Sequence, residues 1–222
     1  MSSDVSTIGV LGGTGAQGRG LAVRWAASGL DVVIGSRDAG RATAAAAEIA
    51  ELAGSQNVRG ADNMTCASES DVVLVAVPWD AHASTLESVR DAVAGKIVID
   101  CVNPLGFDRQ GPFALDLPMS AAEAAQELLP ESRVVAAFHH VSAELLVDPS
   151  LTTIDTDVLV LGEDRDDVAV VQALAERIPG VRGLFGGRLR NAGQVEALTA
   201  NLIAINRRYK THAGIRITMP ET

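Results

Sequence analysis

The sequence predicts an α/β fold, a doubly wound parallel sheet of the Rossmann type with a small C-terminal lobe. Short apolar runs alternate with helical patterns along most of the 222 residues, which is typical of parallel sheets wrapped by helices. The first apolar run ends in a glycine-rich turn that opens a helix. We expect a nucleotide-binding Rossmann domain over residues 1–185 and the lobe over residues 186–222.

The apolar runs and the capping residues place each element. Asp38 is a suitable N-cap for the second helix, and the pair Ser120 and Glu123 forms a capping box for a later one. The uninterrupted apolar run 72–77 indicates a strand buried on both faces. Strands are expected over residues 7–11, 31–35, 57–60, 72–77, 96–102, 133–138 and 157–161, with an edge strand over 181–185. Helices are expected over residues 15–27, 38–54, 81–93, 120–129, 164–178 and 194–209, and a loop or hairpin over 105–119.

The turn after the first strand has the spacing Gly13-x-Gly15-x-x-Gly18. In a dinucleotide-binding fold, Gly13 would permit the tight turn, Gly15 the approach of the pyrophosphate, and Gly18 the close packing of helix on strand. The free amides of the helix N-terminus would bind the diphosphate. The alternative is a glycine-rich turn that only packs, but its position between a strand and a helix favours nucleotide binding.

The second strand ends in Ser36-Arg37, where an NAD-binding chain usually has Asp or Glu. A hydroxyl and a guanidinium favour a 2′-phosphate instead, so the pair predicts NADP(H). Arg41 lies one helical turn further on and can reach the same phosphate. The alternative is that these arginines form salt bridges with Asp38 or Glu48.

Polar and aromatic residues follow the later strands, at the sheet edge where ligands of such folds bind. They are Pro78-Trp79, Asn103 and His139. His139 is the candidate catalytic residue, with a structural hydrogen bond as its alternative. Trp79 either contacts the nicotinamide or fills the core, and His140 is expected to alternate away from the crevice. The other two histidines are expected on the surface: His82 and His212.

The charge balance limits the partners. The net charge of −10 argues against nucleic acid or an anionic membrane. Cys66 and Cys101 have no metal-ligand spacing and are expected to be buried packing residues, which, with no apparent membrane span or signal peptide, indicates a cytoplasmic protein. Residues 182–216 include seven basic residues and one acid. This segment either pairs with the acidic remainder of the chain or binds a polyanionic ligand.

The usual acid–base signatures of dehydrogenases are absent from the sequence. A Tyr-x-x-x-Lys motif is missing, because the single tyrosine, Tyr209, is followed four residues later by Ala213. Hydride transfer between two redox cofactors needs alignment more than acid–base groups. The sequence therefore favours a second redox cofactor as the acceptor.

Several motifs together resemble the NADPH-dependent reductases of coenzyme F-420, a 5-deazaflavin, over essentially the whole chain. They are Gly12-Gly13-Thr14-Gly15 with Gly18, Gly20, Leu21 and Ala22; Gly35-Ser36-Arg37; Val77-Pro78-Trp79; Ala137-Phe138-His139; Leu189-Arg190-Asn191; and Glu196 with Leu198-Thr199. The related domain of membrane ferric reductases shares much of this pattern, but those proteins have membrane helices that are absent from this sequence. Many relatives have Thr where this chain has His140.

The resemblance implies reversible hydride transfer between NADP(H) and coenzyme F-420 in a homodimer whose C-terminal lobe covers the deazaflavin. Thr14, Ser36, Arg37 and Arg41 would bind the 2′-phosphate, and the deazaflavin would stack on the nicotinamide near His139. The full set expected to bind NADP(H) is Gly13, Thr14, Gly15, Ala16, Gln17, Gly18, Ser36, Arg37, Arg41, Val77, Pro78, Trp79, Asn103 and Ala137. The set expected to bind the deazaflavin and its anionic tail is His139, Arg188, Arg190 and Asn191, with Arg207 and Arg208 as second choices. The alternatives are an NADPH-dependent imine or carbonyl reductase of the pyrroline-5-carboxylate reductase type and a non-catalytic NADP(H) sensor.

Overall fold

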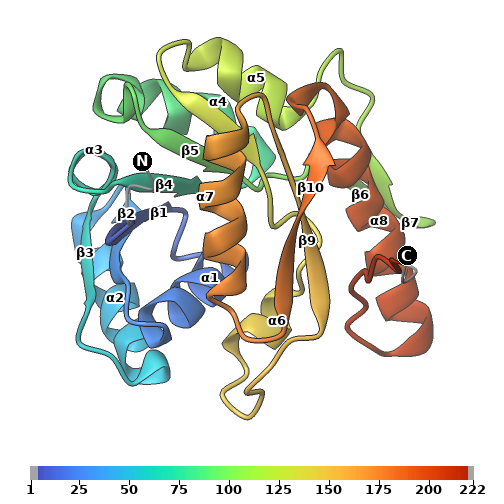
Figure 1. Ribbon diagram of the computed structural model, residues 1–222, viewed down its shortest axis with the longest axis horizontal. Helices are drawn as coiled ribbons and strands as arrows, with labels where there is room; N and C mark the ends of the chain where they lie inside the picture. Colours follow the sequence, from blue (N-terminus) through green and yellow to red (C-terminus); the bar gives the residue numbers. More distant parts are fainter. Residues whose placement is uncertain (1–4, 220–222) are drawn as a thin grey trace.

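A computed structural model describes residues 5–219 (Figure 1). Its centre is an eight-stranded sheet with the order β10-β9-β8-β5-β4-β1-β2-β3. The strands of this sheet are β1 Thr7–Leu11, β2 Asp31–Ser36, β3 Val58–Asp62, β4 Val72–Val75, β5 Ile97–Asp100, β8 Arg133–Ala136, β9 Thr156–Gly162 and β10 Val181–Gly187. The six strands from β3 to β8 are parallel and have the order of a dinucleotide-binding fold.

The helices cover both faces of the sheet, as the alternating sequence pattern predicts. They are α1 Ala16–Ala27, α2 Ala39–Ala53, α3 Asn63–Ser68, α4 Trp79–Val89, α5 Ala121–Leu128, α6 Ala143–Val147, α7 Arg165–Glu176 and α8 Ala192–Tyr209. One apolar core joins the sheet to α1, α2, α6 and α7, and the other joins it to α3, α4, α5 and α8. The doubly wound fold is therefore confirmed.

The last two strands depart from the expected all-parallel arrangement. β9 pairs with β8 in the antiparallel sense, and β10 then runs parallel to β9. The chain reverses because α6 and the segment after it return past α1 to the opposite end of the sheet. Arg24 of α1 stabilises that return, since its guanidinium donates to the carbonyls of Leu145, Leu146, Asp148 and Leu151 at 2.7–3.0 Å.

Most element boundaries agree with the sequence prediction to within a few residues. Asp38 accepts a hydrogen bond from the backbone N–H of Arg41, and Ser120 with Glu123 forms the predicted capping box. β4 and β5 are shorter than expected, because their chains turn away at the sheet edge and α4 begins at Trp79. The short helices α3 and α6 were not predicted, since six and five residues give no clear helical period.

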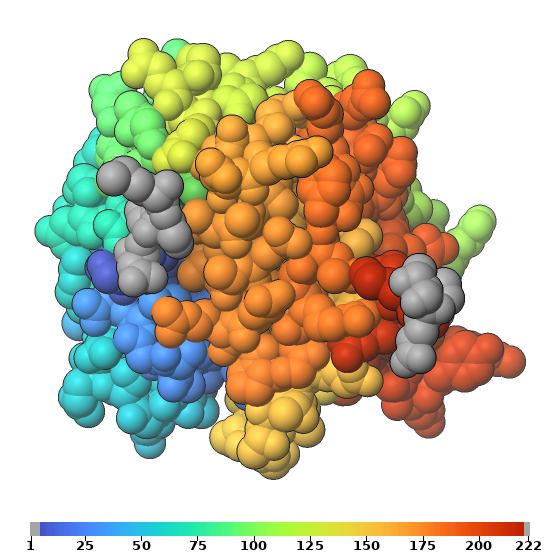
Figure 2. All heavy atoms as spheres, viewed as in Figure 1, coloured from blue at the N-terminus to red at the C-terminus, as the bar shows by residue number. Residues whose placement is uncertain are grey.

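The chain beyond β10 forms α8 and a segment that returns along β9. α8 packs beside the hairpin of β6 Leu105–Asp108 and β7 Gly111–Ala114, which confirms a hairpin within 105–119. Figure 2 shows α8 and the C-terminal segment in red beside the orange face of α7 and β10. The predicted boundary at residue 186 falls at the end of β10, and the division into two domains stays a prediction.

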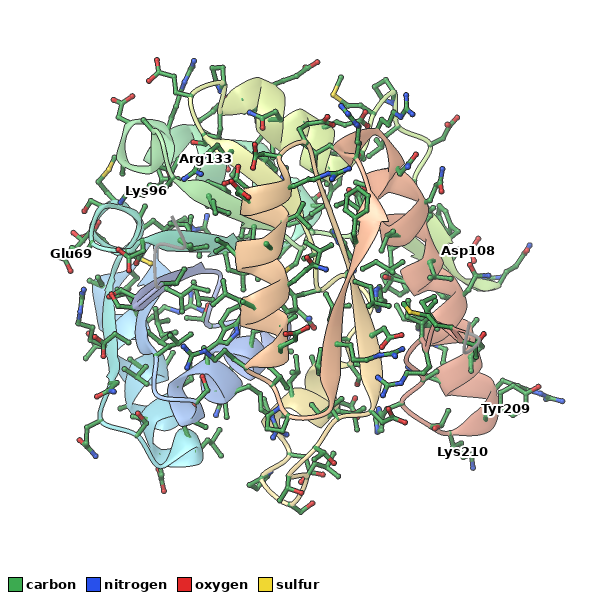
Figure 3. All side chains as sticks on the ribbon, viewed as in Figure 1. Glu69, Lys96, Asp108, Arg133, Tyr209 and Lys210 are labelled. Atoms are coloured by element: carbon green, nitrogen blue, oxygen red, sulfur yellow. The ribbon has the colours of Figure 1, made fainter. Side chains whose placement is uncertain are left out.

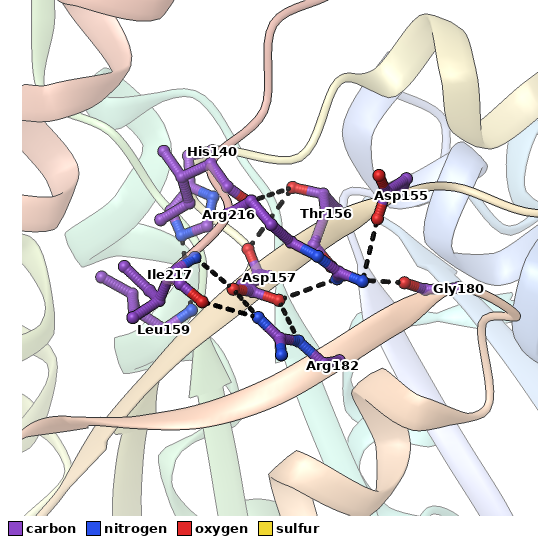
Figure 4. Close-up of polar contacts among 10 residues, drawn as sticks. His140, Asp155, Thr156, Asp157, Leu159, Gly180, Arg182, Arg216 and Ile217 are labelled. Atoms are coloured by element: carbon purple, nitrogen blue, oxygen red, sulfur yellow. Dashed lines mark hydrogen bonds and ion pairs between the residues drawn. The ribbon is translucent and has the colours of Figure 1, made fainter. Parts of the chain in front are cut away.

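Part of the basic segment is neutralised within the fold (Figure 4). Buried Asp157 accepts from Arg182 at 2.7 and 2.6 Å, from Arg216 at 2.9 Å and from the backbone N–H of Ile217 at 2.6 Å. Arg188 pairs with Glu163 at 2.9 Å. Internal pairing, one of the two interpretations of this segment, therefore accounts for three of its arginines.

Cys66 and Cys101 are both free and buried, as expected, and burial raises the pKa of the Cys66 thiol to about 12. Over residues 5–219, no helix has the length and apolar character needed to cross a membrane.

Candidate functional site

The glycine-rich turn lies between β1 and α1, at the carboxyl edge of the sheet. Gly12 has a φ of +88°, so the conformational freedom that the sequence analysis assigned to Gly13 belongs to Gly12. Gly13 is needed for a different reason, because a Cβ there would lie 2.9 Å from the side chain of Ile34 on β2. The turn is therefore held close to the second strand, where the ribose of a nucleotide would lie.

The surroundings of the other two glycines fit the roles that the motif predicts, and the approach of a pyrophosphate to Gly15 stays a prediction. A Cβ on Gly18 would lie 2.7 Å from the carbonyl oxygen of Gly12, so this position lets α1 pack against the turn. A Cβ on Gly15 would have one neighbour, at 3.3 Å. Gly15 is the N-cap of α1 and makes no side-chain cap, so the first-turn amides of Ala16, Gln17 and Gly18 have no intrahelical acceptor and can bind an anion.

A pocket of about 140 Å³ lies beside this turn and contains the predicted phosphate-binding residues. Its lining consists of Gly12, Thr14, Gly35, Ser36, Arg37, Asp38, Arg41, Asn63, Val77, Pro78, Ala81 and Thr85. Arg37 and Arg41 are exposed and form no salt bridge with a residue in the described range 5–219. The competing partners are engaged elsewhere: Glu48 pairs with Arg19 at 2.7 Å, and Asp38 caps α2.

The donors of this first pocket suit a 2′-phosphorylated ribose. Three hydroxyl residues and two arginines are in its lining, and such groups bind phosphate through charge-assisted hydrogen bonds. Asn63 was not predicted from the sequence, and its buried Oδ1 has no hydrogen-bond partner among residues 5–219. Asn63 directly follows β3, at the sheet edge where ligands bind in such folds, and this position could have predicted it as a site residue.

A second pocket, of about 330 Å³, adjoins the first through Val77, which lines both. Its lining consists of Gln17, Ala76, Val77, Cys101, Val102, Asn103, His139, His140, Val141, Ser142, Ala143, Glu144, Thr199, Leu202, Ile203, Asn206 and Ala213. Gln17, Val77, Asn103 and His139 were predicted from the sequence. The contributions of α6 and α8 were not, because the helical period of α8 does not distinguish a pocket from a core.

A tight turn after β8 places the two histidines in this pocket. Phe138 has a φ of +67°, which is rare for a residue other than glycine. Gln17 Nε2 donates to the Phe138 carbonyl at 3.1 Å, while Asn103 Nδ2 and Thr199 Oγ1 donate to the His139 carbonyl at 2.8 and 2.9 Å. Side chains from α1, the β5 edge and α8 thus hold this turn together.

His140 faces the pocket together with His139, so the expectation that it alternates away is wrong. The extended strand ends at Ala136, and the left-handed residue Phe138 breaks the alternation of side chains. Both imidazoles are buried, and burial lowers the pKa of His139 and of His140 to about 4. At neutral pH both rings are therefore uncharged.

Unsatisfied polar atoms make the second pocket a candidate site for a polar ligand. Both ring nitrogens of His139, Nδ1 of His140 and Oδ1 of Asn103 are buried without a partner among the described residues. Buried polar groups of this kind are costly unless a ligand or water completes them. A flat heterocycle bearing amide groups offers both the donors and the acceptors that these atoms lack.

The remaining predicted site residues lie around the pockets rather than in their linings. Trp79 packs on His82, with ring centroids 5.4 Å apart, and against the second core. His82 is buried and bonded to Asp100 at 2.5 Å, so its expected surface position is wrong. His82 is buried because it lies on the side of α4 that faces the sheet. Ala137 is fully buried in the first core.

The anion-binding candidates of the lobe lie at the start of α8. Arg188 is exposed and paired with Glu163, and Arg190 and Asn191 occupy the single 3-10 turn that precedes the helix. All three lie beside the N-terminal end of α8, whereas the helix residues that line the second pocket begin at Thr199. Their assignment to the ligand stays a prediction.

The Rossmann sheet, the glycine turn and the arginine-lined first pocket define a dinucleotide-binding class of protein, with a second pocket beside the first. Residues 7–104 match the family model described as NADP oxidoreductase, coenzyme F420-dependent. The F420-dependent NADP reductases of Methanothermobacter thermautotrophicus and Methanocaldococcus jannaschii are 43% and 37% identical, over 98% and 95% of this chain and 97% of each relative. A crystal structure from Arthrobacter sp. FB24 is similar with a TM-score of 0.79 and 28% identity, over 97% of this chain and 100% of that one. The chain belongs to the F420-dependent NADP reductase family.

Proposed function

We propose that this protein transfers a hydride reversibly between NADP(H) and coenzyme F-420. The observation that carries the proposal is the junction of the two pockets at Val77. A dinucleotide whose 2′-phosphate lies in the first pocket, and whose diphosphate lies on the α1 amides, would bring its nicotinamide to this junction. The second pocket then accommodates the deazaflavin. Bound together, the two ring systems supply the hydride donor and the hydride acceptor.

The protein's own residues would bind, orient and desolvate the two rings. Thr14, Ser36, Arg37 and Arg41 would hold the 2′-phosphate, and Gly13 to Gly18 the diphosphate. The neutral imidazole of His139 would form a hydrogen bond with the deazaflavin or the carboxamide, and Asn103 Oδ1 would accept another. Since the pKa of His139 is lowered to about 4, the proton that accompanies the hydride would come from solvent above that pH rather than from an imidazolium.

The two alternative functions make different demands on the second pocket. An imine or carbonyl reductase needs a group that protonates the substrate, and the two neutral histidines are poor acids. A non-catalytic NADP(H) sensor does not need the unsatisfied polar atoms of His139, His140 and Asn103. Neither alternative accounts for the second pocket as well as a deazaflavin does.

We also propose a cytoplasmic homodimer. Large apolar side chains are exposed on the β6–β7 hairpin and on α8: Phe107, Phe113, Ile205 and Tyr209. Such side chains favour a protein interface over solvent. The two free, buried cysteines are consistent with a reducing compartment. Light scattering at micromolar concentration tests the oligomeric state, and a monomer would contradict it.

The decisive experiment mixes the protein with NADPH and oxidised coenzyme F-420. We expect the visible absorption of the deazaflavin to disappear in proportion to the NADPH consumed. The reverse reaction, from reduced F-420 and NADP, should restore it. A protein that binds NADPH tightly but leaves the absorption unchanged would be a sensor, and this result would overturn the proposal.

A further inference from the structure

We propose that the anionic tail of the deazaflavin leaves the second pocket at the C-terminal end of α8, where Arg207 and Lys210 bind it. This inference rests on the proposed function. It differs from the sequence-based assignment of the tail to Arg188 and Arg190, which lie at the opposite end of the same helix. Coenzyme F-420 has a phosphodiester and an oligoglutamate tail, so the exit of its tail requires positive charge.

The direction of the pocket supports this exit. Its inner end is at Val77 and Gln17, beside the nucleotide pocket, and is the end that the nicotinamide would reach. The deazaflavin therefore enters from the other end, which is lined by Asn206, Ala213 and Glu144. The tail, which leaves the edge of the deazaflavin opposite its reacting carbon, then lies at that outer end. Asn206 Oδ1 accepts from the Ala213 N–H at 2.6 Å, so α8 and the segment after it form one rim.

The helical repeat of α8 brings specific basic residues to this rim. Thr199, Ile203 and Asn206 are spaced by three or four residues and line the pocket on one helix face. Arg207 follows Ile203 by four residues within the helix. Lys210 is the left-handed C-cap residue, and its backbone N–H donates to the carbonyl of Asn206. Figure 3 shows Lys210 at the free end of α8, next to Tyr209. Arg207 therefore flanks the pocket-lining face, and Lys210 lies at the helix end, bonded through its backbone to the rim residue Asn206.

Arg208 provides a contrast within the same turn. It follows Asn206 by two residues, which is roughly 200° around a helix. Arg208 is exposed and lies on the face turned away from the pocket. It has the same charge as Arg207, so it is a matched control for a general effect of net charge.

The positive charges at this end are not neutralised by the fold. The guanidinium of Arg207 lies over the Phe107 ring, 5.8 Å from its centroid, and neither Arg207 nor Lys210 pairs with a carboxylate among residues 5–219. By contrast, Arg188 pairs with Glu163. The carboxylate in the pocket lining, Glu144, lies 3.3 Å from His212 Nε2.

A different exit, between α6 and the C-terminal segment, is chemically less suitable. A pocket of about 210 Å³ adjoins the second pocket there and shares Val141, Ser142 and Ala213 with it. Its charged lining residue is Asp155, with His212 beside it, and it is lined by neither lysine nor arginine. Asp155 is paired with Arg216 at 2.9 Å, so this exit offers a polyanion no free cation, whereas Arg207 and Lys210 at the end of α8 are unpaired among residues 5–219.

The test compares equilibrium binding of two deazaflavins by fluorescence quenching in the absence of NADP. One is coenzyme F-420 with its glutamates, and the other is the tail-free deazaflavin, which lacks the phosphodiester and the glutamates. The variants are Arg207→Gln with Lys210→Gln, Lys210→Glu alone, Arg208→Gln and Arg190→Gln. Lys210→Glu keeps the contact of Arg207 with Phe107. It therefore tests the effect of charge even if the double variant folds poorly.

We expect the double variant to weaken binding of F-420 about tenfold at low salt and to change binding of the tail-free compound less than about twofold. Raising the salt should remove most of the difference. Arg208→Gln and Arg190→Gln should bind both ligands like the wild type. A loss with Arg190→Gln but not with Arg207 and Lys210, or equal losses for both ligands, would overturn the inference.

Failure of the inference is distinguishable from failure of the proposed function. Reduction of the tail-free deazaflavin by NADPH depends on the rings alone. If the wild type reduces it while the variants show no tail-dependent loss, the proposed function stands and the exit is elsewhere. If the wild type reduces neither deazaflavin, the proposed function itself fails.

Discussion

Gln17, in the first turn of α1, donates a hydrogen bond from its side-chain amide to the backbone carbonyl of Phe138, 121 residues further along the chain, at 3.1 Å. Gln17 thereby joins α1, whose N-terminus we propose binds the diphosphate, to the turn that places His139 in the second pocket. Phe138 has a positive φ, so the turn is held by surrounding contacts rather than by its own backbone preference. The turn at the second pocket is thus held in part by a residue of α1.

Replacing Gln17 by leucine is expected to impair the deazaflavin site more than the nucleotide site. The substitution removes the bond to Phe138 but keeps the backbone amide at the N-terminus of α1. We expect kcat/KM for the deazaflavin to fall about tenfold, because small misplacements at a hydride-transfer site are costly. The Kd of NADPH should change less than about twofold.

A chemically matched control is Gln172→Leu. Gln172 of α7 also donates its side-chain amide to a backbone carbonyl, that of Gly183, at 2.8 Å, and it lines neither pocket. This variant should lose stability without a change in kcat/KM. Equal losses of kcat/KM in both variants would refute a positioning role for Gln17.

Arg37→Ala is expected to weaken binding of NADPH selectively. Loss of a charge-assisted contact with the 2′-phosphate should raise the Kd of NADPH about 10- to 100-fold and leave that of NADH nearly unchanged. Arg59→Ala is the control, since Arg59 is exposed but paired with Glu69. Fluorescence titration with both nucleotides measures the effect, and parallel losses for NADH and NADPH would exclude the phosphate role.

Alanine substitutions at Gly15 and Gly18 should separate binding from folding. At Gly18 the new Cβ would lie 2.7 Å from the backbone of Gly12, so we expect a loss of several degrees in Tm. At Gly15 the nearest neighbour is at 3.3 Å, so the fold should tolerate the methyl group, which would instead occupy the approach of the diphosphate. Gly15→Ala should therefore keep its Tm and lose affinity for NADPH. Unchanged NADPH affinity in Gly15→Ala would contradict this assignment.

The first half of the fold was predictable because its signals are local. The spacing of Gly13, Gly15 and Gly18, the cap at Asp38 and the Ser36-Arg37 pair act within a few residues of one another. The antiparallel attachment of β9 was not predictable, because it depends on the long-range contacts that Arg24 makes with the segment after α6. An apolar run predicts a buried strand, but it does not indicate whether that strand runs parallel or antiparallel to its neighbour.

The second pocket was predictable only in part for the same reason. Asn103 and His139 could be inferred from the ends of their strands, where side chains meet at the carboxyl edge of the sheet. The orientation of His140 toward the pocket could not be inferred. It follows from the left-handed conformation of Phe138, and no residue near Phe138 in the sequence predicts that conformation. The pocket-facing side of α8 depends on how that helix docks, and its sequence has apolar residues on more than one face.

Asp157→Asn is expected to destabilise the protein at neutral pH and not at strongly acidic pH. Hydrogen bonds from Arg182 lower the pKa of this carboxyl from 3.8 to about 2. Because the folded state holds the ionised form, the stabilisation is complete above about pH 4 and is lost as the pH falls toward 2. We expect a loss of about 2 kcal/mol at pH 7 in the free energy of unfolding, measured with urea.

Asp155→Asn is the control for this prediction. Asp155 also pairs with Arg216, at 2.9 Å, but its side chain is 83% exposed, so its removal should cost less than about 1 kcal/mol. If the two asparagine variants lose equal stability, or if the loss in Asp157→Asn does not diminish below about pH 4, Asp157 does not anchor the C-terminal segment as described.

Glu196 connects α8 to α5, and its titration should make that connection dependent on pH. Its carboxylate is 3% exposed and accepts from the backbone N–H groups of Ala121 and Ala122 at 3.0 and 3.2 Å. Burial raises its pKa from 4.5 to about 7, with a further contribution from Asp100, against the opposing effect of the two amides. The folded state therefore binds more protons than the unfolded state between these pH values, so stability from this group falls as the pH rises through the window.

The comparison of wild type with Glu196→Gln isolates this effect from the other buried groups. His139 and His140, whose pKa values are lowered to about 4, act in the opposite direction, since they favour the folded state as the pH rises from about 4 to 6.5. Both proteins contain them, so they cancel in the difference. We expect the free energy of unfolding of Glu196→Gln, relative to wild type, to increase by up to about 3 kcal/mol between pH 4.5 and 7.5. A constant difference between Glu196→Gln and wild type across this range would show that Glu196 does not titrate there.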